Sequence, residues 1–189
     1  MIWQTLLILG IVLWYAAHMF KRLAPARRAA MTEKMGEAAR GPIALVLLAS
    51  VVLMVIGFRG SEFVPVYDPP AWGRPVNNLL MVLAVILFGL GSSKSRARGL
   101  LRHPMLTGLF VWSAAHLLVN GDRDSLILFG ALGVWALIQM TLINRAEPGW
   151  DRPTDGSVAG DIRLLVISAV VFAVIAGIHI WLGYNPFRA

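Results

Sequence analysis

The chain has 189 residues, of which 58% are hydrophobic and only 14% are charged, whereas soluble domains carry about a quarter charged residues. This composition excludes a water-soluble domain, and the absence of cysteine excludes disulfides, thiolate metal sites and a cysteine nucleophile. The net charge of +7 would suit nucleic acid, but the basic residues lie between apolar runs, which indicates membrane topology instead. We therefore expect no nucleic acid partner.

Six apolar runs follow one another along the chain, at residues 2–20, 42–58, 76–91, 105–119, 125–143 and 162–182. They predict an all-α, polytopic transmembrane helical bundle of about six spans, with residues 1–189 as a single domain and the lipid bilayer as its partner. A straight helix needs roughly 20 residues to cross the hydrocarbon core. The third and fourth runs are shorter than that, so we expect them to borrow flanking residues.

The positive charges are distributed unevenly between the segments that connect these runs. The first, third and fifth loops hold 13 of the 17 Lys and Arg residues, and the other connections and the C-terminus hold the remaining four. Cytoplasmic loops carry the excess of basic residues, so both termini are expected on the exported side. The first basic cluster follows the first apolar run instead of preceding it, which predicts a retained span rather than a cleaved signal peptide.

Turn-forming residues mark the later connections. The sequence Asn-Gly-Asp at 120–122 predicts a tight turn, and either Asp124 or Ser125 can cap the helix that follows it. The segment 145–161 is rich in Gly, Pro and Asp and has no periodicity, which is typical of a surface loop.

The four histidines, His18, His103, His116 and His179, are the strongest candidates for chemistry, because ionisable groups within a membrane are costly and often functional. His18 and His103 are both expected at cytoplasmic ends of their spans, where they can meet. His116 lies 13 residues beyond His103, about 20 Å further toward the exported side and near the depth of His179. An interhelical hydrogen bond would also explain His116, and an interfacial position is favoured for His179.

A pair of neutral imidazoles from two helices is the usual way for a membrane bundle without cysteine to hold haem iron. The depth argument pairs His18 with His103, and the alternative, that both merely face lipid headgroups, has equal weight. The basic side chains beside this pair include Arg22 and Arg102, which we expect to hold the haem propionates.

Three short motifs follow one another in the middle of the chain: RHPMLTG at 102–108, AHLL at 115–118 and NGD at 120–122. The first apolar run ends in Ala17-His18, and basic residues follow it. In these features the chain resembles the NnrU family of bacterial membrane proteins, and the resemblance covers nearly its whole length. It implies a single NnrU-like transmembrane domain, a multi-pass protein of the bacterial inner membrane, and a link to nitrite and nitric oxide reduction.

The resemblance extends to a plant relative, the plastid 15-cis-ζ-carotene isomerase, which is a haem b protein that isomerises a double bond through redox-controlled iron ligation. This likeness implies haem b as the cofactor and His18 and His116 as the iron ligands. The depth argument selects His103 as the partner of His18 instead, so all three histidines stay candidates. Because the chain has no cysteine, a ligand switch to sulfur is impossible here.

Two functions follow as hypotheses. The first is a haem b membrane protein with two imidazole ligands and a redox or isomerase role linked to nitrogen-oxide metabolism (denitrification) or to isoprenoid metabolism. The second is a cofactor-free membrane scaffold or assembly factor that acts on a denitrification-related membrane enzyme. Transport has less support, because no apolar run contains an internal acidic residue.

Overall fold

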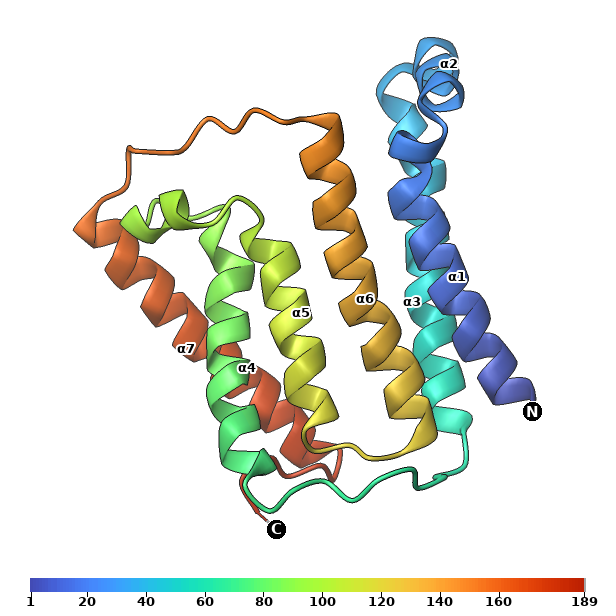
Figure 1. Ribbon diagram of the computed structural model, residues 1–189, viewed down its shortest axis with the longest axis vertical. Coiled ribbons are helices and arrows are strands. Elements are labelled where there is room, and N and C mark those ends of the chain that lie inside the picture. Colours follow the sequence, from blue (N-terminus) through green and yellow to red (C-terminus); the bar gives the residue numbers. More distant parts are fainter. Residues whose placement is uncertain (189) are drawn as a thin grey trace. The chain divides into compact units, whose positions relative to one another are not determined.

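The computed structural model describes residues 1–188 as helices joined by short connections (Figure 1). In chain order these are α1 (Ile2–Leu23), α2 (Pro25–Met35), η1 (Gly36–Ala39), α3 (Arg40–Gly60), α4 (Gly73–Leu90), η2 (Arg96–Leu100), α5 (Pro104–Leu117), α6 (Arg123–Ala146) and α7 (Val158–Trp181). The elements η1 and η2 are short 3-10 helices. Within the described residues there are isolated β-bridges but no strand, which confirms the predicted all-α class.

The chain packs as two compact units. Unit 1 comprises Met1–Val66 and Asp122–Ala131, and unit 2 comprises Tyr67–Gly121 together with the chain from Leu132 onward. Helix α6 therefore gives its residues 123–131 to unit 1 and its remaining turns to unit 2. The expectation of a single domain over residues 1–189 stays a prediction.

Unit 1 is built on an antiparallel pair of helices, α1 and α3 (Figure 1). A Cβ atom on Gly57 of α3 would lie 2.4 Å from the amide nitrogen of Leu7, and one on Gly10 of α1 would lie 2.7 Å from the carbonyl oxygen of Ser50. Real Cβ atoms do not approach backbone so closely, so only glycine permits this separation of the two helices. Small residues commonly play this part between membrane helices.

The start of α6 completes unit 1. The side-chain amide of Gln4 donates to the Asp124 carboxylate over 3.2 Å, and the hydroxyl of Tyr15 donates to the carbonyl oxygen of Ala131 over 2.6 Å. Asp122 begins this helix, because its carboxylate accepts from the backbone N–H groups of Asp124 and Ser125 at 3.1 and 2.9 Å. The predicted cap at Asp124 or Ser125 is therefore wrong by two or three residues.

The first basic loop, residues 21–40, is itself largely helical. Pro25 stands in the first turn of α2, where its missing N–H costs little, and α2 ends at Gly36, whose φ of 57° favours glycine. Alanine, arginine, lysine, glutamate and methionine dominate α2, and all of them favour the helix. None of its residues is buried, so α2 forms a polar connection between two apolar helices.

In unit 2, α5 and α7 both pack antiparallel to α4 (Figure 1). A Cβ on Gly108 of α5 would lie 3.2 Å from the carbonyl oxygen of Ala84, so these helices are in close contact. The buried side chains of Leu87, Leu90 and Leu164 form the core where α4 meets the start of α7. The polar residue Asn78 ties α4 to the end of the chain by donating to the carbonyl oxygen of Pro186 over 3.1 Å.

Within residues 1–188, five helices are long and apolar enough to cross a membrane: α1, the continuous segment Pro25–Gly60, α4, α6 and α7. The remaining apolar run forms α5, which has 14 residues and is about 21 Å long, less than the hydrocarbon core of about 30 Å. Large apolar side chains such as Val166 and Val170 of α7 are more than half exposed. The molecule is thus a multi-pass helical membrane protein, with these five long spans and one shorter apolar helix.

Candidate functional site

Two histidines, one in each unit, end the same five-residue motif. The sequence WYAAH ends at His18 in α1 of unit 1, and the sequence WSAAH ends at His116 in α5 of unit 2. Residues four apart in a helix are neighbours on one face. The ring centroids of Trp14 and His18 are 4.1 Å apart, and those of Trp112 and His116 are 4.6 Å apart, with interplanar angles of 44° and 48°. Each imidazole is therefore held against an indole of its own helix.

Each of these imidazoles also makes the same hydrogen bond. Nδ1 of His18 donates to the carbonyl oxygen of Trp14 over 3.0 Å, and Nδ1 of His116 donates to that of Trp112 over 2.9 Å. A carbonyl oxygen only accepts, so the proton of the neutral ring is on Nδ1 and the lone pair is on Nε2. Histidines that bind metals are usually oriented by such a second hydrogen bond. In this tautomer Nε2 is the atom through which either ring would bind a metal.

The end of α5 is closed around His116. The side-chain amide of Asn120 donates to the carbonyl oxygen of His116 over 2.8 Å, and the backbone N–H of Asn120 donates to the same oxygen over 3.0 Å. Gly121 follows directly and lies against Tyr67, because a Cβ on Gly121 would lie on the carbonyl oxygen of Tyr67. Asn120 therefore anchors the carboxyl end of the motif.

His179 shares part of this arrangement. Its Nδ1 donates to the carbonyl oxygen of Ile175 over 2.8 Å, but an isoleucine stands where the other two motifs have tryptophan. His179 and Trp112 line one cavity of unit 2, so His179 lies in the same region of unit 2 as the second motif. The expectation that His116 and His179 lie at about one depth in the membrane stays a prediction.

His103 is built differently. It occupies the N-cap position of α5 immediately before Pro104 without a capping side-chain hydrogen bond, and its Nε2 forms a 2.8 Å hydrogen bond with the side-chain oxygen of Asn144. His103 and His116 stand at opposite ends of the same helix, 13 residues and about 20 Å apart. Because two axial ligands must reach one iron, these two histidines cannot serve the same haem.

Both arginines expected to hold propionates lie at helix ends. Arg22 stands in the last turn of α1, one turn beyond His18. Arg102 donates to three consecutive backbone carbonyl groups of the segment after α6, those of Glu147, Pro148 and Gly149. Arg102 therefore anchors this loop, and its role toward a propionate stays a prediction.

With this geometry in place, the comparison with known families decides the family. The family model described as NnrU protein matches residues 6–186, nearly the whole chain. The chain belongs to the NnrU family. No match was found among curated proteins or among solved structures.

The NnrU chain offers few other ways to hold a metal ion. Among residues 1–188, no three His, Cys, Asp or Glu side chains gather closely enough to form a metal site. A haem iron takes its four equatorial ligands from the porphyrin and needs only one or two from the protein. By donor chemistry, His18 and His116 fit this requirement.

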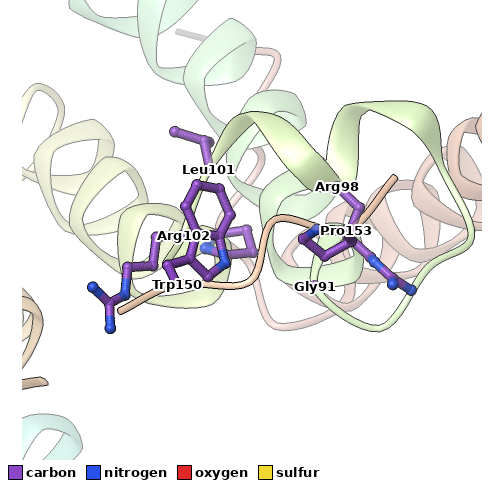
Figure 2. A pocket seen from close by; sticks show the side chains of 7 residues that line it. Gly91, Arg98, Leu101, Arg102, Trp150 and Pro153 are labelled. Atoms are coloured by element: carbon purple, nitrogen blue, oxygen red, sulfur yellow. The ribbon is translucent and has the colours of Figure 1, made fainter. Parts of the chain in front are cut away.

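A small cavity of about 370 Å³ lies where the loop after α6 meets η2 (Figure 2). Figure 2 shows Leu101, Arg102 and Trp150 at one end of this cavity and Arg98 and Pro153 at the other. Arg98 donates to the carbonyl oxygen of Ser93 over 3.1 Å and pairs with Asp155 at 3.0 Å, so both arginines of the cavity are engaged by the protein. The cavity therefore lies where two loops of this NnrU protein are held together by their own hydrogen bonds and ion pair.

The segment 145–161 is mostly exposed and lacks regular structure over most of its length, so the predicted surface loop is confirmed. Hydrogen bonds hold it to the chain around η2 at several residues. Ser157 donates to the carbonyl oxygen of Lys94 over 2.9 Å, Arg152 donates to that of Gly99, and Asp161 accepts from the hydroxyl of Ser95 over 2.7 Å.

Sequence analysis missed Trp14 and Trp112 as part of the histidine sites. The signal was present, because W-x-A-A-H occurs twice. A search for tandem repeats at a fixed period does not find the two copies, because they lie far apart in the sequence.

Proposed function

We propose that this NnrU-family membrane protein binds haem b and that His18 and His116 each supply an imidazole ligand to haem iron. The proposed role is redox chemistry or double-bond isomerisation, linked to nitrogen-oxide or isoprenoid metabolism in the bacterial inner membrane. The observation that carries the proposal is the pair of W-x-A-A-H motifs, in which both rings donate Nδ1–H to the tryptophan carbonyl one turn earlier.

The local structure supports ligation in two ways. The backbone carbonyl of Trp14 or Trp112 fixes the tautomer, so that the lone pair lies on Nε2, the atom that would bind iron. The indole beside each imidazole restricts rotation of the ring, which lowers the entropy lost when a ligand bond forms. Neither feature is needed by a histidine that merely faces lipid headgroups.

The remaining candidates have secondary roles in this proposal. His103 occupies the N-cap position of α5 and holds Asn144, and it keeps α5 attached to the end of α6. Arg22 and Arg102 carry the positive charge that the two propionates require. When bound, haem b would supply one-electron redox chemistry, and the protein ligands in this proposal are the imidazole nitrogens of His18 and His116.

The proposed orientation has both termini on the exported side. It rests on the excess of basic residues in the first, third and fifth loops, which include α2 and η2. In this orientation the N-cap residue His103 lies at the cytoplasmic end of α5, and His116 lies at its exported end.

The proposal is tested by absorption spectra of the purified, haem-supplemented protein before and after reduction with dithionite. We expect a stoichiometric Soret band in the wild type that is lost or shifted in His18→Ala and in His116→Ala. His179→Ala is the matched control, because His179 has the same Nδ1 hydrogen bond but no tryptophan partner. A wild-type protein without a Soret band would contradict the proposal and favour a cofactor-free assembly factor for a denitrification enzyme.

A further inference from the structure

Unit 2 contains an elongated cavity of about 650 Å³ between α4 and α7, within the roughly 300–1,000 Å³ of small-molecule sites. Apolar side chains from these two helices form its walls, among them Val85, Phe88, Leu164, Ile167 and Val171. Such walls suit a hydrocarbon chain.

One end of the cavity is cationic. Lys94 and Arg163 both line it, and neither makes an ion pair within residues 1–188. The two basic residues nearby do make ion pairs: Arg96 pairs with Asp161 at 2.6 Å, and Arg98 pairs with Asp155 at 3.0 Å. Asp155 and Asp161 are thus already paired, and the two positive charges of Lys94 and Arg163 remain at the mouth of an apolar cavity.

The length of the cavity also limits its occupant. Arg163 and His179, which line its two ends, are 16 residues apart in α7 and therefore separated by about 24 Å. The acyl chains of one leaflet span about 15 Å, half of the hydrocarbon core. An acyl chain that starts at Arg163 therefore ends along α7 before it reaches His179.

We propose that this cavity binds one anionic phospholipid of the surrounding bilayer. Its phosphate lies on Lys94 and Arg163, and one acyl chain lies against the walls formed by α4 and α7. The net charge of the headgroup is the selective feature, because two cations without carboxylate partners favour an anionic over a zwitterionic lipid. The proposal is independent of haem binding.

The test is native mass spectrometry of the delipidated full chain in detergent, titrated with phosphatidylglycerol and with phosphatidylcholine of the same acyl chains. A cation near an anionic lipid contributes about 1 kcal/mol, and 1.4 kcal/mol corresponds to a factor of ten in affinity. We therefore expect phosphatidylglycerol to bind the wild type about 30-fold more tightly than phosphatidylcholine. A wild type with equal affinity for both lipids would overturn the proposal.

Variants locate the site. The double change Lys94→Gln and Arg163→Gln breaks no ion pair, and it should abolish the preference for phosphatidylglycerol. Arg145→Gln removes one positive charge from an exposed position outside the cavity, and it should leave the preference unchanged. Val171→Trp places a larger side chain in the apolar wall of the cavity and should weaken the binding of both lipids.

Further outcomes separate lipid binding in this cavity from a loss of folding, from diffuse electrostatic attraction and from dimerisation. Lys94→Arg with Arg163→Lys retains both charges and should keep the preference, which a general loss of folding would not. An equal loss of preference in Arg145→Gln would overturn the proposal in favour of diffuse attraction to the basic loops. A lipid-free dimer that Val171→Trp dissociates would overturn it in favour of a second copy as the occupant.

Discussion

Substitution of Gly57 by alanine tests the packing of unit 1 most sharply. The added Cβ would lie 2.4 Å from the amide nitrogen of Leu7 and 2.7 Å from the carbonyl oxygen of Trp3, both of which are backbone atoms of α1. Backbone cannot rotate away as a flexible side chain can, so α1 and α3 must separate. Overpacking of this kind costs about 1–3 kcal/mol, and two backbone clashes place the cost near 3 kcal/mol. The better helix propensity of alanine offsets about 1 kcal/mol of this destabilisation. The net expectation is destabilisation by about 2 kcal/mol.

The assay is reversible unfolding of the detergent-solubilised protein by sodium dodecyl sulfate, followed by tryptophan fluorescence. Gly177→Ala is the matched control, because a Cβ on Gly177 of α7 meets no atom within 4 Å. The control should be as stable as the wild type or slightly more so. If Gly57→Ala unfolds at the same detergent fraction as Gly177→Ala, then α1 and α3 do not pack through these glycines, and the description of unit 1 is wrong.

Three further predictions concern caps, loops and the histidine motifs. Asp122→Ala removes the carboxylate that begins α6 and should lower the free energy of unfolding by about 1 kcal/mol in the same assay. Asp161→Asn weakens the hydrogen bond to Ser95 and the ion pair with Arg96, so trypsin should cleave after Arg96 several times faster. Asp151→Asn, in the loop before α7, should leave the cleavage rate unchanged. Trp112→Leu should reduce the haem content of the purified protein, and Trp112→Phe, which keeps an aromatic ring beside His116, should retain most of it; equal content in both variants would contradict a role for the ring.

Most of the fold was predictable from the pattern of apolar residues. A long apolar run specifies a helix wherever it lies in the sequence, because backbone polar groups must be satisfied within the segment in a membrane. The short helix α5 shows the limit of this reasoning. Its run extends to residue 119, but the helix ends at Leu117, where Tyr67 donates from a distant loop to the carbonyl oxygen of that residue. Such a contact is set by tertiary structure and leaves no trace in hydropathy.

The polar connections were predicted less well, for two different reasons. Helix α2 follows from local propensity, which the interpretation of residues 21–40 as a loop neglected. The anchoring of segment 145–161 depends on Asp155 and Asp161, whose partners Arg98 and Arg96 are 57 and 65 residues away in the sequence. No pattern within the segment indicates those partners.

For the candidate site, spacing and contacts within one helix were predictable, whereas contacts between helices were not. Helix rise placed His116 about 20 Å from His103, and the structure agrees because both belong to one helix. The hydrogen bond of His103 to Asn144 was not predictable, since it joins two helices. The packing of Trp14 on His18 was predictable, because it depends only on a spacing of four residues in a helix.

The most direct test of the central proposal is chemical rescue of the iron ligands. His18→Gly and His116→Gly each remove one imidazole, and His179→Gly removes a ring that is not a proposed ligand. We expect the absorption spectrum of the oxidised haem protein to change in the first two variants and to return to that of the wild type when free imidazole is added. The spectrum of His179→Gly should match the wild type throughout. A wild-type spectrum in His18→Gly or His116→Gly without imidazole would show that the altered histidine does not bind the iron.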